Sequence, residues 1–248
     1  MKNTKIMDMS LRKDPEEANY IRDMFASISG RYDLMNRLIT FGRDIAWRRF
    51  MISMTNVPKG GRLLDVGTGT GGIAFEALRA DPSVRVTGLD FTLDMMKAGR
   101  KRKFPDQIGW CLGDALRLPF PDATFDAVTS GFLIRNTLGV RSAFREQMRV
   151  VKPGGRVVCL DTSPAPRNIS RPFSMFHLRV LIPLLGFMIT GKKGAYKYLS
   201  TSTFNFIEPD VLSDIMKDEG FEEVGFRHFM FGNIALHWGT RPVPDSTI

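Results

Sequence analysis

A glycine-rich loop is the segment of this sequence best suited to bind a ligand. It reads Asp65-Val66-Gly67-Thr68-Gly69-Thr70-Gly71 and follows directly on a strand-like run, 62–66. Glycines permit a tight turn here and let a ligand approach the backbone at the N-terminus of the next helix. By glycine spacing alone, the loop suits NAD as well as S-adenosylmethionine. The loop alone therefore does not distinguish between the two cofactors.

Carboxylates at three successive strand ends favour the second of these cofactors. Asp65 lies two residues before the first glycine, where it suits a sulfonium and an ammonium group but would repel a pyrophosphate. Asp90 closes the second strand and can hold ribose hydroxyls, and Asp114 follows the third strand and can accept from the adenine amino group. Each alone could be a cap or turn residue. Together they predict an S-adenosylmethionine site, with S-adenosylhomocysteine as product, that includes the neighbouring Phe91 and Ala115.

The elements that position these residues alternate regularly from about residue 60 onward. Predicted strands at 62–66, 85–90, 109–112, 126–130 and 156–161 alternate with predicted helices that begin at 71 and cover 93–103 and 140–151. This alternation indicates an α/β, Rossmann-like fold with a mostly parallel sheet. A further helix at 210–219 precedes two strand-like runs, 223–229 and 234–240.

The last two strand-like runs are separated by 230–233 only, too few residues for a crossover helix. They should therefore pair as an antiparallel hairpin and complete a seven-stranded sheet. This hairpin suits a class I methyltransferase better than a dinucleotide-binding domain. An NAD(P)-dependent oxidoreductase is thus the less favoured alternative.

Composition narrows the class of protein further. The N-terminus lacks the uninterrupted apolar run of a secretory signal, and no stretch approaches 18 apolar residues, so we expect a soluble, cytoplasmic protein. Cys111 and Cys159 lie in strand-like runs, which favours buried thiols over a disulfide or a metal site, and no metal is expected.

Two segments lie outside the alternation of strands and helices. We expect 1–57 to be a helical lid on a methyltransferase domain at 58–248, and 162–207 to be an insertion that forms a substrate wall. The insertion has no Asp or Glu between its end residues, and its cations supply +6 of the net charge of +9: Arg167, Arg171, Arg179, Lys192, Lys193 and Lys197. Because aliphatic residues interleave these cations and no RNA-binding module is present, nucleic acid is not expected as a partner.

Several longer motifs extend beyond the glycine loop. They are Arg31-Tyr32-Asp33-Leu34-Met35-Asn36, Leu118-Pro119-Phe120-Pro121-Asp122, Phe132-Leu133-Ile134-Arg135-Asn136, Arg149-Val150-Val151-Lys152-Pro153-Gly154-Gly155 and Ala195-Tyr196-Lys197-Tyr198-Leu199. With these motifs, residues 20 to 242 resemble the ubiquinone and menaquinone biosynthesis C-methyltransferases, also called demethylmenaquinone methyltransferases. The resemblance implies S-adenosylmethionine-dependent methylation of a ring carbon of a prenylated quinol.

A few positions depart from this family's pattern. Asp44 stands where the family has histidine, Asp161 where it has glutamate, and Ile207 where it has proline. A family serine that touches the cofactor aligns with Gly131, which leaves Ser130 beside it, and we assign both to the cofactor site. These departures leave a paralogue that methylates another small aromatic as an alternative.

Methylation of a ring carbon sets the requirements for catalytic residues. Such a carbon becomes a good nucleophile when an adjacent hydroxyl ionises, so a cation must stabilise the phenolate. Arg135 is the first candidate, with Asn136 orienting a hydroxyl or water; Tyr32, with Asp33, is a candidate lid contact or proton relay. A structural ion pair for Arg135 and simple packing for Tyr32 are the alternatives.

The histidines are weaker candidates for a base. His228 and His237 fall in the terminal hairpin, whereas His177 lies in the basic insertion and could reach a substrate.

The apolar run 173–189 is interrupted by Pro183, and we predict that it is too short and broken to span a bilayer. It is either a peripheral contact at the inner face of the membrane, which would receive the prenyl tail, or an ordinary buried helix pair. Both interpretations stay open, as does a homo-oligomer.

Overall fold

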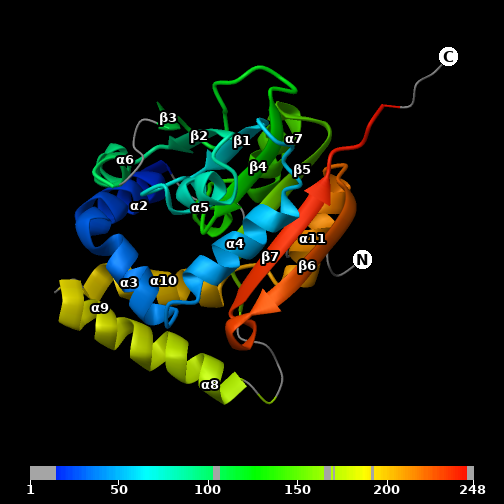
Figure 1. Cartoon of the computed structure of the whole chain (residues 1–248). Helices are drawn as coiled ribbons and strands as arrows, with labels where there is room; N and C mark the ends of the chain where they lie inside the picture. Colours follow the sequence, from blue (N-terminus) through cyan, green and yellow to red (C-terminus); the bar gives the residue numbers. More distant parts are fainter. Residues whose placement is uncertain (1–14, 103–106, 165–168, 170, 191–192, 245–248) are drawn as a thin grey trace.

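One seven-stranded sheet organises the chain (Figure 1). The structure, a computed structural model, describes residues 15–102, 107–164, 169, 171–190 and 193–244. The strands are β1 (Arg62–Val66), β2 (Arg85–Asp90), β3 (Ile108–Leu112), β4 (Phe125–Gly131), β5 (Val151–Thr162), β6 (Glu222–Phe229) and β7 (Ile234–Thr240). Their order is β3-β2-β1-β4-β5-β7-β6, and β7 runs antiparallel to both of its neighbours. The predicted fold class is therefore confirmed.

Helices cover both faces of the sheet, which explains why β1 is apolar on both sides. On one face, α4 (Asp44–Met54) and α5 (Gly72–Ala80) bury Trp47, Met51 and Phe75 against the strands. On the other face, α7 (Val140–Val150) and α11 (Pro209–Asp218) bury Phe144 and Ile215. Another helix, α6 (Leu93–Arg100), follows β2.

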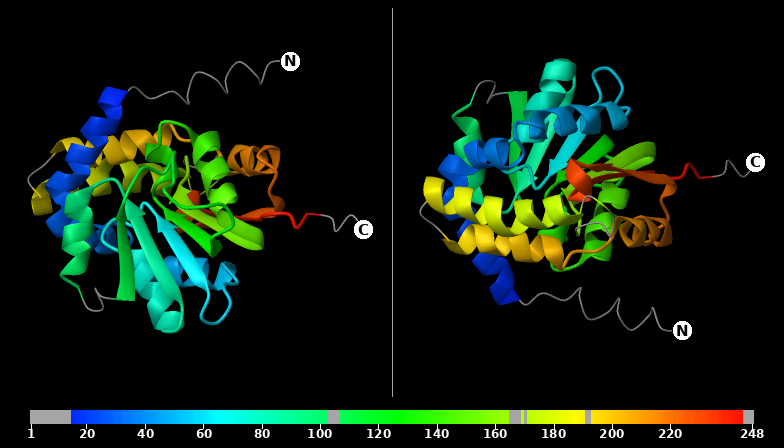
Figure 2. Two further views of the ribbon diagram at one scale, coloured as in Figure 1. Left: turned by 90° about the horizontal axis from the view of Figure 1, so that it is seen from above. Right: turned by 90° about the horizontal axis from the view of Figure 1, so that it is seen from below.

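The two segments outside the alternation pack on each other. The N-terminal segment forms α2 (Pro15–Ile28), the short turn η1 (Ser29–Arg31) and α3 (Tyr32–Ile39). The insertion forms α8 (Arg171–Phe176), the π-helical turn η4 (His177–Leu181), α9 (Ile182–Thr190) and α10 (Lys193–Phe204). Met35 and Ile39 share a small core with Leu178 and Ile182, and Figure 2 shows α9 and α10 side by side.

The prediction of a short, broken apolar segment is wrong. α8, η4 and α9 form one continuous helix, whose stretch from Arg171 to Ile189 is long and apolar enough to cross a membrane by length and composition. Pro183 lacks the N–H that would bond to the carbonyl of Arg179, and the helix widens to a π turn just before it, so that the chain continues past the proline. Length and composition alone place no helix in a membrane.

The two cysteines are free, as predicted. Cys159 is buried in β5, whereas Cys111 in β3 is only partly buried. Burial raises the pKa of both thiols, which keeps them protonated.

Candidate active site

The glycine loop joins β1 to α5 in a conformation that side chains disfavour. Gly67, Gly69 and Gly71 have φ of 68°, 57° and 78°. A Cβ on Gly67 would also lie 2.8 Å from Cδ1 of Leu133. The glycines therefore serve both the turn and the close approach of the neighbouring loop.

Asp65 lies beneath this loop and is fully buried. Its carboxylate accepts hydrogen bonds from Oγ1 of Thr68 (2.7 Å) and Oγ1 of Thr129 (2.9 Å). Burial raises its pKa to about 6, against the opposing effect of these hydroxyls. Asp65 thus acts on the loop from below, and its charge can reach a ligand only through space.

Asp90 and Asp114 lie at the edge of the cavity above the loop. Asp90 accepts from the backbone N–H of Gly69 and of Thr92, both at 2.7 Å, and burial raises its pKa. The exposed Asp114 accepts from the N–H of Leu116 at 2.9 Å. Each carboxylate oxygen has lone pairs left for a ligand that carries hydroxyl or amino donors.

The cavity above the loop, here named the cofactor cavity after the predicted residues that line it, holds about 820 Å³ of empty space, part of it open to solvent. Seven of the residues predicted from the sequence to bind cofactor line it: Gly67, Gly69, Asp90, Phe91, Asp114, Ala115 and Gly131. Five others are not among its lining residues: Asp65, Thr68, Thr70, Gly71 and Ser130. The carboxylates of the cavity can accept hydrogen bonds from the hydroxyl and amino donors of an adenosyl group, and its apolar walls, such as Phe91 and Met95, suit the flat ring.

A second cavity of about 820 Å³ adjoins the first. Most of its lining is apolar and comes from α2, α3, η4, α9 and α10. Phe25, Tyr32 and Phe132 line both cavities and therefore form the boundary between them. Such a shared wall is where a group would pass from a ligand in one cavity to a ligand in the other.

Arg135 lines the second cavity as a buried cation. It follows β4 in the turn η3 (Ile134–Asn136), and its side chain is 4% exposed. Its guanidinium donates to Oδ1 of Asp161, and its backbone N–H donates to Oδ2 at 3.1 Å. Asp161 also accepts from the N–H of Thr162 at 2.7 Å. The pair holds a positive charge in a fixed position at an apolar wall.

Asn136 and Tyr198 connect the two cavities. The amide of Asn136 donates to the carbonyl of Phe132 at 2.9 Å and accepts from the hydroxyl of Tyr198 at 3.1 Å. Asn136 lines the cofactor cavity and Tyr198 the apolar one. Burial raises the pKa of Tyr198 to about 12, and it raises that of Tyr32 as well, so both phenols are protonated donors at neutral pH.

Sequence reasoning did not single out Tyr198 or Phe132 as site residues. Phe132 has φ of 56°, a left-handed conformation that is strained for a large residue, and its N–H donates to the carbonyl of Leu160 at 2.6 Å. The motifs at 132–136 and 195–199, which contain these residues, were the available signals. Nothing local to 198 indicates that it reaches residue 136.

The three histidines lie in different surroundings. His177 lines the apolar cavity, its Nε2 lies 2.7 Å from the carbonyl of Ile39, and burial lowers its pKa. His237 is buried in β7 with a pKa lowered to about 4, and His228 is exposed on β6. Neither hairpin histidine lines the two cavities.

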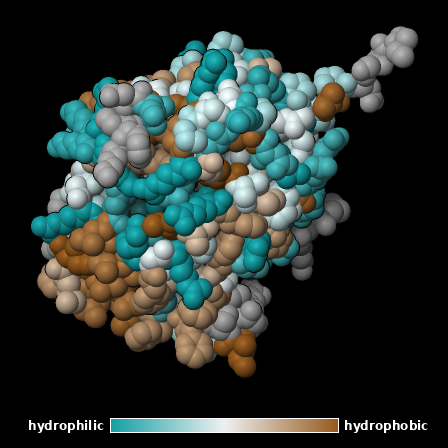
Figure 3. Space-filling view, in the orientation of Figure 1, coloured by the Kyte–Doolittle hydropathy of each residue, from teal (hydrophilic) through white to brown (hydrophobic). Residues whose placement is uncertain are grey.

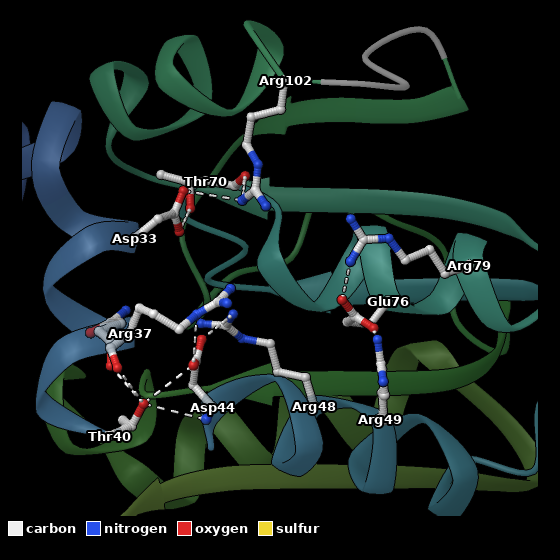
Figure 4. A network of polar contacts seen from close by, with 11 residues as sticks. Asp33, Arg37, Thr40, Asp44, Arg48, Arg49, Thr70, Glu76, Arg79 and Arg102 are labelled. Atoms are coloured by element: carbon white, nitrogen blue, oxygen red, sulfur yellow. Dashed lines mark hydrogen bonds and ion pairs between the residues drawn. The ribbon is translucent and has the colours of Figure 1, made fainter. Parts of the chain in front are cut away.

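Polar contacts fasten the N-terminal helices to the cofactor loop (Figure 4). Asp33 on α3 accepts from Oγ1 of Thr70 at 2.8 Å and from Arg102 at 3.1 Å. The guanidinium of Arg102 also lies 4.6 Å from the ring centroid of Phe75. The loop and the helices above it are therefore linked directly.

Asp44, one of the departures from the family pattern, is buried at the start of α4. It pairs with Arg48 at 2.8 Å and with Arg37 at 3.4 Å, and Thr40 donates to it at 3.2 Å. This network fixes the junction between α3 and α4 (Figure 4).

Comparison with known proteins gives a consistent result. A profile of the ubiE/COQ5 methyltransferase family matches residues 12–241. The chain is 47% identical over 221 residues to the ubiquinone/menaquinone biosynthesis C-methyltransferase UbiE of Desulfotalea psychrophila, covering 89% of this chain and 90% of the relative. It is 38% identical over 221 residues to the demethylmenaquinone methyltransferase of Thermus thermophilus, covering 88% and 100%.

Solved structures share the fold at low sequence identity. Phosphoethanolamine N-methyltransferase 2 of Haemonchus contortus, in complex with S-adenosyl-L-methionine, matches with a TM-score of 0.61 and 16% identity. The match covers 80% of this chain and 53% of that one, so it spans about half of the larger protein.

Proposed function

Because the chain belongs to the ubiE/COQ5 methyltransferase family, we propose that it methylates a ring carbon of a prenylated quinol in menaquinone or ubiquinone biosynthesis. The methyl donor is S-adenosylmethionine, which leaves as S-adenosylhomocysteine. The observation that carries the proposal is that Arg135, paired with the buried Asp161, lines an apolar cavity that shares a wall with the cofactor cavity.

The cofactor residues fit the donor by charge and shape. Asp90 would hold the ribose hydroxyls, Asp114 the adenine amino group, and Gly67 and Gly69 would lie against the amino-acid portion. When bound, S-adenosylmethionine supplies the electrophilic methyl group. Asp65 would favour this positive ligand from beneath the loop.

The residues around the apolar cavity would activate the acceptor. Carbon methylation forms a carbon–carbon bond at the ring and releases the ring proton, so the ionised hydroxyl beside that carbon must be stabilised. Arg135 would supply the stabilising charge, held by Asp161. Asn136 and Tyr32 would orient the ring hydroxyl or a water, and Tyr198 would hold Asn136 in place by donating to its amide oxygen. The raised pKa values keep both tyrosines protonated.

The proton released from the ring needs an acceptor or a path to solvent. His177 lines the cavity and is neutral because burial lowers its pKa, so it could accept the proton only to pass it on. We therefore propose His177 as a proton relay, a secondary role beside that of Arg135.

We assign the remaining parts of the chain by their position around these cavities. Residues 1–57 act as the lid and 162–207 as the substrate wall of the methyltransferase domain at 58–248, because described residues of both segments, within 24–40 and 162–203, line the apolar cavity. A prenylated substrate lies in a membrane, so we place the protein in the cytoplasm with a peripheral contact at the inner face of the membrane.

Expression in a bacterial strain that lacks its own quinone C-methyltransferase tests this function. We expect the wild-type chain to replace the accumulated demethylated quinone by the methylated one, and Arg135→Gln, at equal protein level, to fail. An unchanged quinone profile with well-expressed wild-type protein would favour an acceptor of another kind.

A further inference from the structure

Large apolar side chains are exposed along one side of the insertion helix. The residues of this α8–α9 face are 47% to 71% exposed: Phe173, Phe176, Val180, Leu184, Phe187 and Met188. Their spacing of mostly three and four residues places them on one side of a helix. In Figure 3 hydrophobic residues gather over this part of the molecule. Monomeric proteins rarely expose so much contiguous apolar surface without a partner.

The opposite side of the same helix forms a wall of the substrate cavity. Leu178 and Ile182 are buried and line the cavity, together with His177, which is held at the carbonyl of Ile39. Only 28% of the apolar stretch is buried, which does not fit an ordinary core helix. Because its inner side packs on α3 and α10, the helix does not fit a membrane-spanning segment either.

The cavity is too small to enclose a long prenyl tail. Its empty space is about 820 Å³ even with the part open to solvent included, which leaves room for a ring and the beginning of a chain. The rest of the tail must leave the protein, and the wall made by η4 and α9 has apolar residues on both sides. A wall that is apolar on both sides suits a tail that stays in lipid.

The charge near the helix favours an anionic surface. Residues 163–206 contain no Asp or Glu. Arg171 and Arg179 are exposed on the helix itself, and the guanidinium of Arg179 lies 5.1 Å from the ring centroid of Phe204. Cations beside an inserted apolar face add attraction to anionic headgroups.

We propose that the α8–α9 face docks in the plane of an anionic phospholipid leaflet, so that the quinol tail runs from the leaflet into the apolar cavity. This inference rests on the proposed function and specifies its membrane contact. The helix lies along the surface with its aromatic side chains in the acyl boundary.

Vesicle binding and a comparison of two substrates test the inference. The full chain is sedimented with vesicles of phosphatidylglycerol and phosphatidylcholine in equal parts, and with phosphatidylcholine alone. The test variant is the double substitution Phe176→Glu and Met188→Glu, at side chains that are 61% and 71% exposed. The matched control is Val243→Glu, 67% exposed and beside Gly154 at the amino ends of the parallel strands.

We expect each of the two α8–α9 substitutions in the double variant to weaken vesicle binding about tenfold or more. The Val243→Glu control should bind vesicles as the wild type does. Binding should be stronger with phosphatidylglycerol and weaker at high salt. The double variant should methylate a short-chain, water-dispersed quinol at the wild-type rate but lose activity on a long-chain quinol held in vesicles.

Two results would overturn the inference while leaving the proposed function intact. One is equal vesicle binding by the wild type and the double variant. The other is a wild type that sediments as a dimer and ignores vesicles, with the double variant monomeric, which would make the face an interface between two copies. Failure of the wild type to methylate any quinol, short or long, would instead contradict the proposed function.

Discussion

Replacing Asp65 by asparagine probes the charge beneath the cofactor loop. The Asp65 carboxyl is fully buried, and burial raises its pKa from the ordinary 3.8 to about 6. A shift of this size corresponds to roughly 3 kcal/mol between the two protonation states. Asparagine has nearly the same shape and stays neutral, so it removes the ionisation and keeps partners for Thr68 and Thr129.

The sign of the effect follows from the direction of the shift. Because the folded state raises the pKa of Asp65, the protonated form favours folding, and that stability is lost as the pH rises from about 4 through 6. Asp65→Asn should therefore gain stability relative to the wild type between about pH 4 and pH 8, by up to roughly 3 kcal/mol. Urea unfolding of both proteins across this range measures the difference, in which other titrating groups cancel. A difference that does not change with pH would refute the reasoning.

The same substitution should weaken binding of the methyl donor. A positive ligand favours the ionised carboxylate, so at pH 6, near the pKa of Asp65, binding should release about half a proton. Calorimetry in buffers of different ionisation enthalpy measures this release. We expect a smaller release from Asp65→Asn, together with roughly tenfold weaker binding. Equal proton release by both proteins would show that Asp65 does not sense the ligand.

Three further substitutions test the other contacts of the site. Asp161→Asn leaves the buried Arg135 without its carboxylate, so the free energy of unfolding should fall by roughly 3–5 kcal/mol and kcat should fall at least about tenfold. Asp161→Glu should recover part of both. Unchanged unfolding and kcat would argue against a role for the pair. Tyr198→Phe removes a donor to Asn136 and should lower kcat about fivefold to tenfold, with an unchanged KM for the methyl donor. A change in that KM alone would instead assign Tyr198 to cofactor binding. Asp33→Asn weakens the partly exposed contacts of Asp33 with Thr70 and Arg102, so S-adenosylhomocysteine should be released up to about fivefold faster. Stopped-flow fluorescence measures this rate. An unaltered rate would mean that the lid does not limit release.

The sheet could be predicted because its signals are local. Apolar runs and glycine or proline stops gave β1, β2 and β7 with the observed bounds. β5 begins five residues earlier than the predicted 156, because Val151 already pairs with Phe125 before the Pro-Gly-Gly turn, a contact that periodicity does not report. The antiparallel hairpin followed from a connection too short for a helix.

The site was only partly predictable because it depends on contacts between distant segments. Asp90 and Asp114 could be placed from strand ends, since parallel strands end at one edge. That Asp65 lies beneath the loop depends on Thr129 of the neighbouring strand. The contact between Tyr198 and Asn136 joins residues 62 positions apart, and the continuous helix through Pro183 depends on a π turn.

The position of the transferred methyl group tests the proposed function most directly. Purified enzyme is incubated with S-adenosylmethionine labelled in its methyl group and a demethylated, prenylated quinol kept reduced, and the product is examined by mass spectrometry and NMR. Label on a ring carbon is the predicted result, and it should be lost in Arg135→Gln. Label on an oxygen, or methylation of soluble phenols with none of the prenylated quinol, would contradict carbon methylation of a lipid quinol.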